Sequence, residues 1–470
     1  MSKDNTSQKL AKSQYAMVAI VMSGGFITLL NQLVMSPALP SVMKDLNITA
    51  STGQWLMSIF LLVNGLMVPI TAYLINRFTS RQIYIAAMCA FTAGSIVAAM
   101  SSGFTVLLLG RIIQAVGAGI MLPFSIVMLL LIFPKSRRGF ALGIAGVVIG
   151  FAPAFGPTLA GWIVDVWGWR YIFVFITPIA AILMIFAICK LENIGERSAG
   201  KLDWLSVALS TVGFGGLLYG FSIASEFGWV SPYTLGPICI GAVTLVFFAR
   251  RQLSRSDPML NLRILRNGVF STSTILAAVV SAGLTVGAVV TPIYLQTVMG
   301  LSALHSGLML MPGALCMAGM SPISGILFDR FGPRALSITG LLIMTTGSVM
   351  LAFLGVSSPY AYVCIGYSLR MFGISMVNMP VNTWGLNVLS NRLIAHGNAI
   401  NNTARQVGGS LGTAILVTVM MIVIANSDLP GAQATVAGIN AAFRGACGLT
   451  AAALILTIVR VKGEGNGEDY

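Results

Sequence analysis

Charged residues are scarce in this chain. Only 9% of its 470 residues are Asp, Glu, Lys or Arg, whereas about a quarter of a soluble globular protein is charged. This scarcity excludes a water-soluble enzyme. Hydrophobic residues make up 56% of the chain, which excludes intrinsic disorder, because disordered chains are poor in apolar residues and rich in charge. The remaining class is a polytopic membrane protein.

The chain also lacks the residue groups that metal, redox and nucleotide chemistry need. Its six cysteines stand singly inside apolar runs, without the spacing of a metal or redox motif. No glycine–lysine phosphate-binding loop occurs, so this chain does not hydrolyse ATP. No cluster of Ser, His and Asp and no large soluble segment indicates an intramembrane enzyme or a receptor. We therefore expect no cofactor, no metal and no enzymatic activity.

The sequence is instead rich in apolar runs that are long enough to cross a membrane. Fourteen such runs occur, and a spanning helix needs about 20 apolar residues. When the runs alternate from a cytoplasmic start, 21 of the 27 basic residues fall on the cytoplasmic side. The net charge of +14 is thus a topology signal and does not indicate a nucleic-acid partner. We expect a multi-pass protein of the cell membrane with both termini in the cytoplasm.

Two segments of the chain repeat one another. Residues 72–81 and 325–334 both read small-x-Leu-x-(Asn/Asp)-Arg-Phe-x-x-Arg, and Arg111 and Arg370 give a second echo. Two related halves around a site at the midplane are typical of a secondary transporter. The expected parts are a tail over 1–14, a six-helix half over 15–190, two inserted helices with linkers over 191–266, a second six-helix half over 267–460 and a tail over 461–470.

Five further motifs occur at residues 30–40, 111–119, 150–157, 202–204 and 401–409. With these motifs in this order, the chain resembles a major facilitator superfamily transporter of the fourteen-span drug:proton antiporter family. Within that family it is similar to the branch that includes lincomycin-resistance exporters, from about residue 15 to residue 460. The resemblance implies an all-α polytopic fold with two six-helix halves plus two extra central helices. It also implies a monomer that transports small molecules across a lipid bilayer.

In the resembled family, the repeated loops form a cytoplasmic gate and the glycine- and proline-rich motif of span five seals one half against the other. An acid in such a loop can cap a facing helix. Asn76 replaces that acid in the first copy, so we expect a gate there that is weaker or less sensitive to pH. The alternatives are that the loop arginines only set topology and that the span-five motif only packs tightly. The predicted gate is Asn76, Arg77, Arg81, Asp329, Arg330 and Arg334, and the predicted antiporter motif is Gly150, Pro153, Gly156 and Pro157.

Arg111 is the most informative single residue. A cation deep in a span costs about 3 kcal/mol or more and must face protein or water. It is either a ligand for substrate or coupling, or a hydrogen-bond hub for carbonyl groups. Methionines nearby would suit several apolar ligands or would simply fill the core. The predicted substrate site between the halves is Asn31, Gln32, Arg111, Gln114, Tyr294, Arg370, Met371 and Asn378.

No acidic residue lies near the middle of a predicted span, although proton antiport is usually carried by a buried carboxylate. Many members of the resembled family have one in span one, where this chain has Asn31 and Gln32. Asp165, near the outer end of span five, is the nearest substitute, with a solvated loop acid as its alternative. Proton coupling is thus implied by the resemblance alone. The expected function is export of amphipathic, drug-like compounds by alternating access. The alternative is an exporter or facilitator of an endogenous anionic metabolite or lipid, without proton antiport through a buried carboxylate.

Overall fold

Helices make up all the regular structure in the part of the chain that is described. The computed structural model describes residues 12–48, 50–134, 137–194, 203–256, 258–301 and 303–461. A helix satisfies its backbone hydrogen bonds within one segment, as a chain that faces lipid must. The all-α polytopic fold expected from the sequence is therefore confirmed.

The first half of the chain folds into long rods with short connections. The rod that begins at Lys12 is interrupted at Val34 and continues as a short helix. A capping box at Thr79 and Gln82 starts the fourth helix, where each residue bonds the backbone N–H of the other. The helices are α1 (Lys12–Leu33), α2 (Met35–Leu46), α3 (Ala50–Arg77), α4 (Ser80–Ala99), α5 (Phe104–Ile132), α6 (Arg138–Trp167) and α7 (Arg170–Lys190).

The second half contains one element that changes direction inside its span of residues. In α11 the backbone of Gly332 has φ 74°, a left-handed conformation that favours glycine, and it divides the element into two rods. The helices after α7 are α8 (Trp204–Phe227), α9 (Pro232–Ser254), α10 (Gly268–Ile293), α11 (Ala303–Leu351), α12 (Tyr360–Asn387), α13 (Ile394–Ala425) and α14 (Gly431–Arg460). Short helical turns cover Leu262–Arg266, Tyr294–Val298 and Asn391–Leu393.

The number of membrane crossings is not fixed by these helices alone. Eleven helices in the described residues are long and apolar enough to cross a membrane, and α11 counts as one of them although it holds two rods. The count of fourteen spans therefore stays a prediction.

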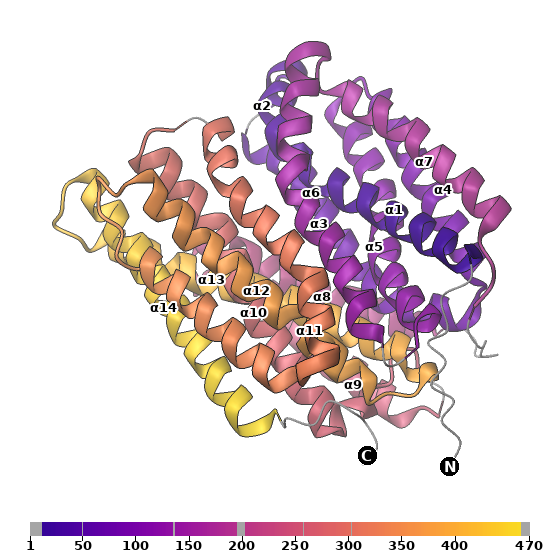
Figure 1. Cartoon of the computed structure of the whole chain (residues 1–470). Coiled ribbons are helices and arrows are strands. Elements are labelled where there is room, and N and C mark those ends of the chain that lie inside the picture. The colour runs from indigo at the N-terminus through magenta and orange to yellow at the C-terminus, as the bar shows by residue number, and fades with distance from the viewer. Residues whose placement is uncertain are drawn as a thin grey trace.

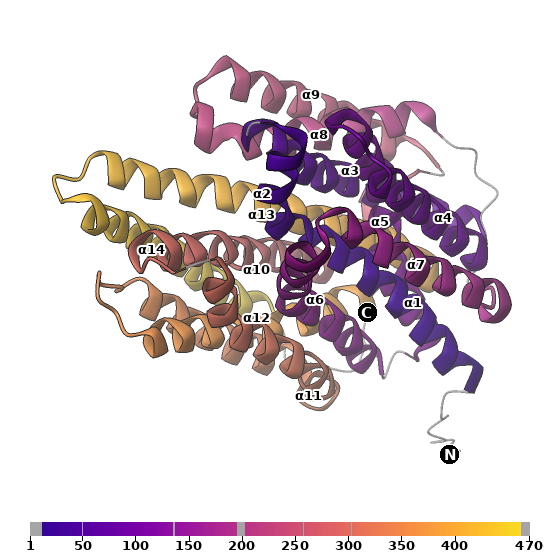
Figure 2. The ribbon, with the colours of Figure 1, turned by 90° about the horizontal axis from the view of Figure 1, so that it is seen from above.

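Two groups of helices lie side by side in Figure 1, α1 to α7 in indigo and magenta and α10 to α14 in orange and yellow. Seen from above in Figure 2, α8 and α9 lie on one side of the junction, next to α3 and α13. On the opposite side of the junction α6 packs along α11. The exact residue boundaries of the halves remain a prediction.

The same glycine pattern joins a pair of helices in each group. Gly94, Gly110 and Gly117 bring α4 against α5, and Gly347, Gly366 and Gly373 bring the second rod of α11 against α12. The partners correspond too, because Gly94 lies on the backbone of Gln114 and Gly347 lies on the backbone of Arg370. Small residues permit this approach of helix backbones in a membrane. The pattern supports two related halves, but it makes Arg370 the equivalent of Gln114, so the expected echo with Arg111 is one helical turn out of register.

We call one end of the bundle the basic end, because α3 and α9 both end there with an arginine in the last turn, Arg77 and Arg251. It is the end that the charge distribution assigns to the cytoplasm. The opposite end, where Arg170 pairs with Asp45, is called the outer end. Both names describe positions in the fold.

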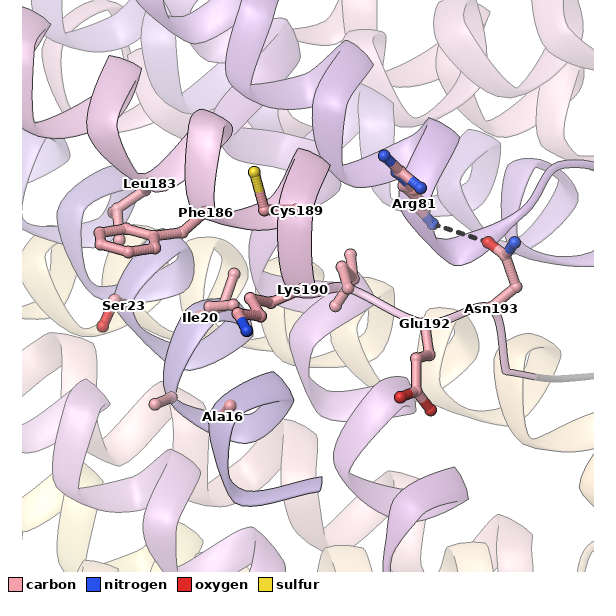
Figure 3. Close-up of a pocket in the computed structure, with 12 residues that line it drawn as sticks. Ala16, Ile20, Ser23, Arg81, Leu183, Phe186, Cys189, Lys190, Glu192 and Asn193 are labelled. Atoms are coloured by element: carbon pink, nitrogen blue, oxygen red, sulfur yellow. Dashed lines mark hydrogen bonds between the residues drawn. The ribbon is translucent and has the colours of Figure 1, made fainter. Parts of the chain in front are cut away.

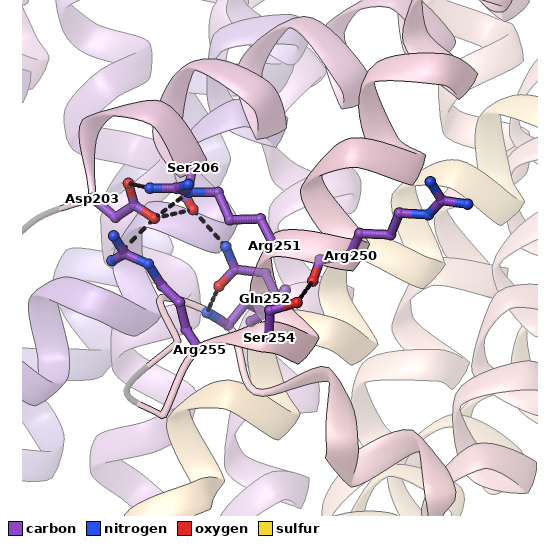
Figure 4. Close-up of polar contacts among 8 residues, drawn as sticks. Asp203, Ser206, Arg250, Arg251, Gln252, Ser254 and Arg255 are labelled. Atoms are coloured by element: carbon purple, nitrogen blue, oxygen red, sulfur yellow. Dashed lines mark hydrogen bonds and ion pairs between the residues drawn. The ribbon is translucent and has the colours of Figure 1, made fainter.

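At the basic end, a buried carboxylate ties α8 and α9 together (Figure 4). Asp203 precedes α8 and accepts hydrogen bonds from Arg251 Nε at 2.8 Å and Arg251 Nη2 at 2.9 Å. Arg255 lies 3.2 Å from the same carboxylate, and Ser206 also donates to it. The Arg251 hydrogen bonds hold the pKa of Asp203 well below its usual range, so this clamp keeps its charge at neutral pH.

The junction between α6 and α11 is built from glycines at the basic end. A Cβ on Gly143 would lie 2.7 Å from Pro322 Cα, and one on Gly150 would lie 2.7 Å from Ala318 Cα. Further along α6, Gly156 faces Leu33 of α1 instead, and Gly161 has no atom within 4 Å of its Cβ position. The two helices therefore touch from the basic end to Gly150 and part beyond it.

We predict that Gly143→Val destabilises the protein through this junction, whereas Gly161→Val does not. Overpacking at Gly143 should cost about 1–3 kcal/mol, because the neighbour is backbone and cannot move aside cheaply. The melting temperature of the purified protein measures the effect. Equal losses in the two variants of the same helix would contradict the account.

Candidate functional site

Arg111 lies fully buried inside the first group of helices. Its Nε donates to the carbonyl of Leu56 at 3.4 Å, and Nη1 donates to Gln114 Oε1 at 3.1 Å and to the carbonyl of Asn31 at 3.5 Å. The guanidinium carbon stands 4.1 Å from the centre of the Phe60 ring, a cation–π arrangement. Two helices besides its own, α1 and α3, thus hold this cation, through carbonyls and a ring.

Arg370 is held in a similar way in the second group. Its Nε donates to Ser348 Oγ at 2.9 Å, and Nη2 donates to the carbonyl of Gly283. The correspondence with Gln114 continues here, because Gln114 Nε2 donates to Ser95 Oγ at 2.7 Å. Gly287 lies against the guanidinium so closely that a Cβ would collide with Nη1. The glycine therefore makes the room that the larger side chain of Arg370 needs.

Neither buried guanidinium is paired with a carboxylate in the described part of the chain. Arg111 Nη2 and Arg370 Nη1 are buried without a hydrogen-bond partner there, and so are both polar atoms of the Asn31 side chain. Buried donors without partners cost free energy, which favours an incoming acceptor. Chemically, the group around Arg111 can bind a carbonyl, a hydroxyl or an anion.

The structure brings four of the eight predicted substrate residues together in the first half. Asn31, Arg111 and Gln114 are linked by the contacts above, and the neighbouring Gln32 accepts from Asn64 Nδ2 at 3.4 Å. Gln32 is the one of the eight that is partly exposed.

The four predicted residues of the second half are less closely grouped. Arg370, Met371 and Asn378 follow one another along α12 and are buried. Tyr294 lies apart from them, because it follows α10 and its hydroxyl donates to the carbonyl of Gly355 at 2.7 Å. Eleven residues separate it from the Gly283 carbonyl that Arg370 binds, which is about 16 Å along a helix.

Sequence reasoning missed an amide network that includes a contact between the halves. Asn398 Nδ2 on α13 donates to the carbonyl of Pro123 on α5 at 3.0 Å. Asn401 Nδ2 donates to Asn382 Oδ1 at 2.9 Å and its Oδ1 accepts from Thr274 at 2.6 Å. The asparagine-rich motif at residues 401–409 was the signal available in the sequence.

Asp329 links the halves at the basic end. It accepts hydrogen bonds from the backbone N–H groups of Gly139 and Phe140, at the start of α6. Arg137, the residue in the N-cap position of α6, makes no capping bond with its own side chain, so the cap comes from the other half. Beside it, Arg138 Nη2 donates to Asn391 Oδ1 at 3.0 Å, which is a third polar contact between the halves.

The contacts described for the other predicted gate residues stay within their own half. Arg81 donates to the carbonyl of Ile188 at the end of α7, and Arg334 donates to the carbonyl of Ile458 at 3.4 Å. Arg330 stacks on Phe331, and Arg77 is exposed. In the predicted antiporter motif, Gly150 lies in the junction with α11 and Gly156 faces α1. The side chains of Asn76, Pro153 and Pro157 lie outside the described residues.

Comparison with known proteins identifies the family to which this chain, with its arrangement of two helical halves, belongs. Residues 21–413 match the family described as Major Facilitator Superfamily. The chain belongs to this superfamily. As a major facilitator protein it is 46% identical to the uncharacterized MFS-type transporter YcnB of Bacillus subtilis strain 168, over 91% of this chain and 90% of that protein. It is 38% identical to the lincomycin resistance protein LmrB of the same strain, over 92% of this chain and 93% of LmrB.

The fold of this major facilitator protein is also found in solved structures. The human organic anion transporter MFSD10 superposes with a TM-score of 0.68, over 94% of this chain and 99% of that one. The sequence identity is 16%, so this likeness concerns the fold alone. The expected superfamily is confirmed by the sequence matches, and the expected fold by this superposition.

We predict that Asp329→Ala loosens the closure of the basic end, whereas Asp329→Asn, which can still accept, loosens it less. Loss of a helix cap costs about 1 kcal/mol, which is about a fivefold change in an equilibrium. Labelling of Ser321→Cys by a thiol reagent, in a background without other cysteines, measures the opening because Ser321 is buried beside Gly146.

Asp428→Ala is the matched control, since Asp428 is exposed and follows α13 at the outer end. Labelling that rises equally in the Asp329→Ala and Asp428→Ala proteins, or in neither, would contradict the proposed cap.

Proposed function

We propose that this major facilitator protein is a secondary active transporter that exports amphipathic, drug-like compounds by alternating access. The observation that carries the proposal is its 38% identity, over nearly its whole length, to a protein named for lincomycin resistance. The structure supports the mechanism in a second way. The halves meet at the basic end through glycine contacts, one helix cap and amide bonds, and such contacts can open without breaking a buried ion pair.

The proposed substrate contacts begin with Arg111 and Asn31. Their unpartnered polar atoms would form hydrogen bonds with the polar part of an amphipathic compound, with Arg111 as a donor and Asn31 as a donor or an acceptor. Gln32 is partly exposed beside this buried group and would be the first side chain that a substrate meets. In the structure both Arg111 and Asn31 are fully buried, so the proposal requires α1 or α3 to move when a substrate binds.

The proposed energy source is inferred from the family to which the chain belongs and not from its own residues. A proton gradient would drive export, although this chain has amides at residues 31 and 32 where a titrating acid would be useful. Asp165, near the outer end of α6, is exposed and fits a solvated acid better than a buried proton carrier.

A second candidate function is favoured by the buried arginines. Two guanidinium groups that lack a carboxylate partner would suit an anionic metabolite or lipid as cargo, carried without proton antiport through a buried acid. Arg111 and Arg370 would then act as ligands in the two halves. The substrate charge and the response to a pH gradient separate this candidate from the first.

Growth inhibition tests the proposed export directly. A host stripped of its own exporters that expresses this protein should tolerate higher concentrations of lincomycin or of other amphipathic inhibitors. Arg111→Ala should abolish the protection at equal protein level, and Arg460→Ala, an exposed cation at the end of α14, should retain it. Full protection by Arg111→Ala would refute the role given to that cation.

The same substrates in proteoliposomes test the coupling. Export that increases with an imposed pH gradient supports proton antiport. Transport that is indifferent to the gradient and prefers anions would replace the first candidate with the second. Absence of any transport, together with absence of protection, would refute both.

A further inference from the structure

A groove of about 1050 Å³ lies between α1 and α7, away from the junction of the halves (Figure 3). Small side chains on α1, Ala16, Ala19 and Ser23, form one wall. Leu183 and Phe186 of α7 form the other. The groove runs from the basic end along eight residues of α1, from Ala16 to Ser23, which is about 10 Å of helix.

The outside of α7 next to this groove is strongly apolar and exposed. Ile182, Ile185 and Phe186 are 51%, 57% and 53% exposed. Such a surface on a membrane protein faces acyl chains, so the groove opens toward lipid. Its length of about 10 Å suits the first part of one acyl chain whose headgroup lies at the basic end.

The polar end of the groove is basic. Lys190 ends α7, and Figure 3 shows its side chain beside Ile20 at the mouth of the groove. Arg81 lies on the other side of the mouth, where its backbone N–H donates to Asn193. Glu192 is the one acid among the lining residues, so two cations outnumber it. The net positive charge of this lining favours a headgroup with a net negative charge over a zwitterionic or cationic headgroup.

We infer that this groove binds one anionic phospholipid of the leaflet at the basic end, with its phosphate at Lys190 and Arg81 and an acyl chain along Ala19 and Phe186. The inference does not depend on the transported substrate. It has a consequence for the gate, because Arg81 also donates to the carbonyl of Ile188 and Ser80 donates to that of Ile194 at 2.9 Å. A lipid at the mouth would thus contact the linker that is tied to the repeated loop.

Native mass spectrometry of the purified full-length protein tests the site with two probes of equal acyl chains, phosphatidylglycerol and phosphatidylcholine. The wild type should retain phosphatidylglycerol over phosphatidylcholine by about fivefold or more, since each basic residue near the surface contributes about 1 kcal/mol to the binding of anionic lipid. Lys190→Glu should remove that preference, and Glu192→Gln should increase it. Ala19→Phe, which fills the apolar wall, should reduce retention of both lipids.

Lys44→Glu is the matched control, because Lys44 is an exposed lysine of α2 at the outer end. The wild-type preference should survive in this variant. Equal retention of the two lipids by the wild type would overturn the inference. So would a Lys190→Glu protein that behaves like the Lys44→Glu protein, or preferential retention of a neutral amphiphile over phosphatidylglycerol. Since no outcome requires transport, failure here is distinguishable from failure of the proposed function.

Discussion

The close contact between α6 and α11 constrains the rest of this molecule. Glycines bring the two backbones together over the basic end of the junction, from Gly139 to Gly150, and the helices part beyond it. Protein interiors are densely packed and have discrete arrangements, so such a contact opens or closes as a unit. The polar contacts between the halves, made by Asp329, Arg138 and Asn398, accompany the glycine contact and fix its register.

Much of the fold could be predicted from the sequence, because hydropathy and the placement of cations report directly on burial in lipid. The repeated loops also predicted related halves, which the matching glycine contacts support. The register could not be predicted. A shift of one helical turn leaves the apolar pattern of a span almost unchanged, so Arg370 could be paired with Arg111 although its contacts match those of Gln114.

The candidate site was harder to predict, because a sequence shows which residues are polar but not which neighbours they meet. Tyr294 is an example, since its hydroxyl binds a loop carbonyl far from the buried arginines. Asn398 shows the opposite case. It was not predicted, yet it binds the carbonyl of Pro123, which is 275 residues away in the chain. Buried cations are the more reliable signal: their cost in a membrane requires nearby acceptors, and both arginines have them.

Paired distances between spin labels test most directly whether the halves move against each other. One pair, at Arg137 and Ser390, spans the basic end, and a second pair, at Lys44 and Ser357, spans the outer end; all four positions are exposed. On adding an exported drug in proteoliposomes, the first distance should lengthen while the second shortens. Distances that stay constant, or that change in the same direction at both ends, would contradict a junction that opens alternately to the two faces.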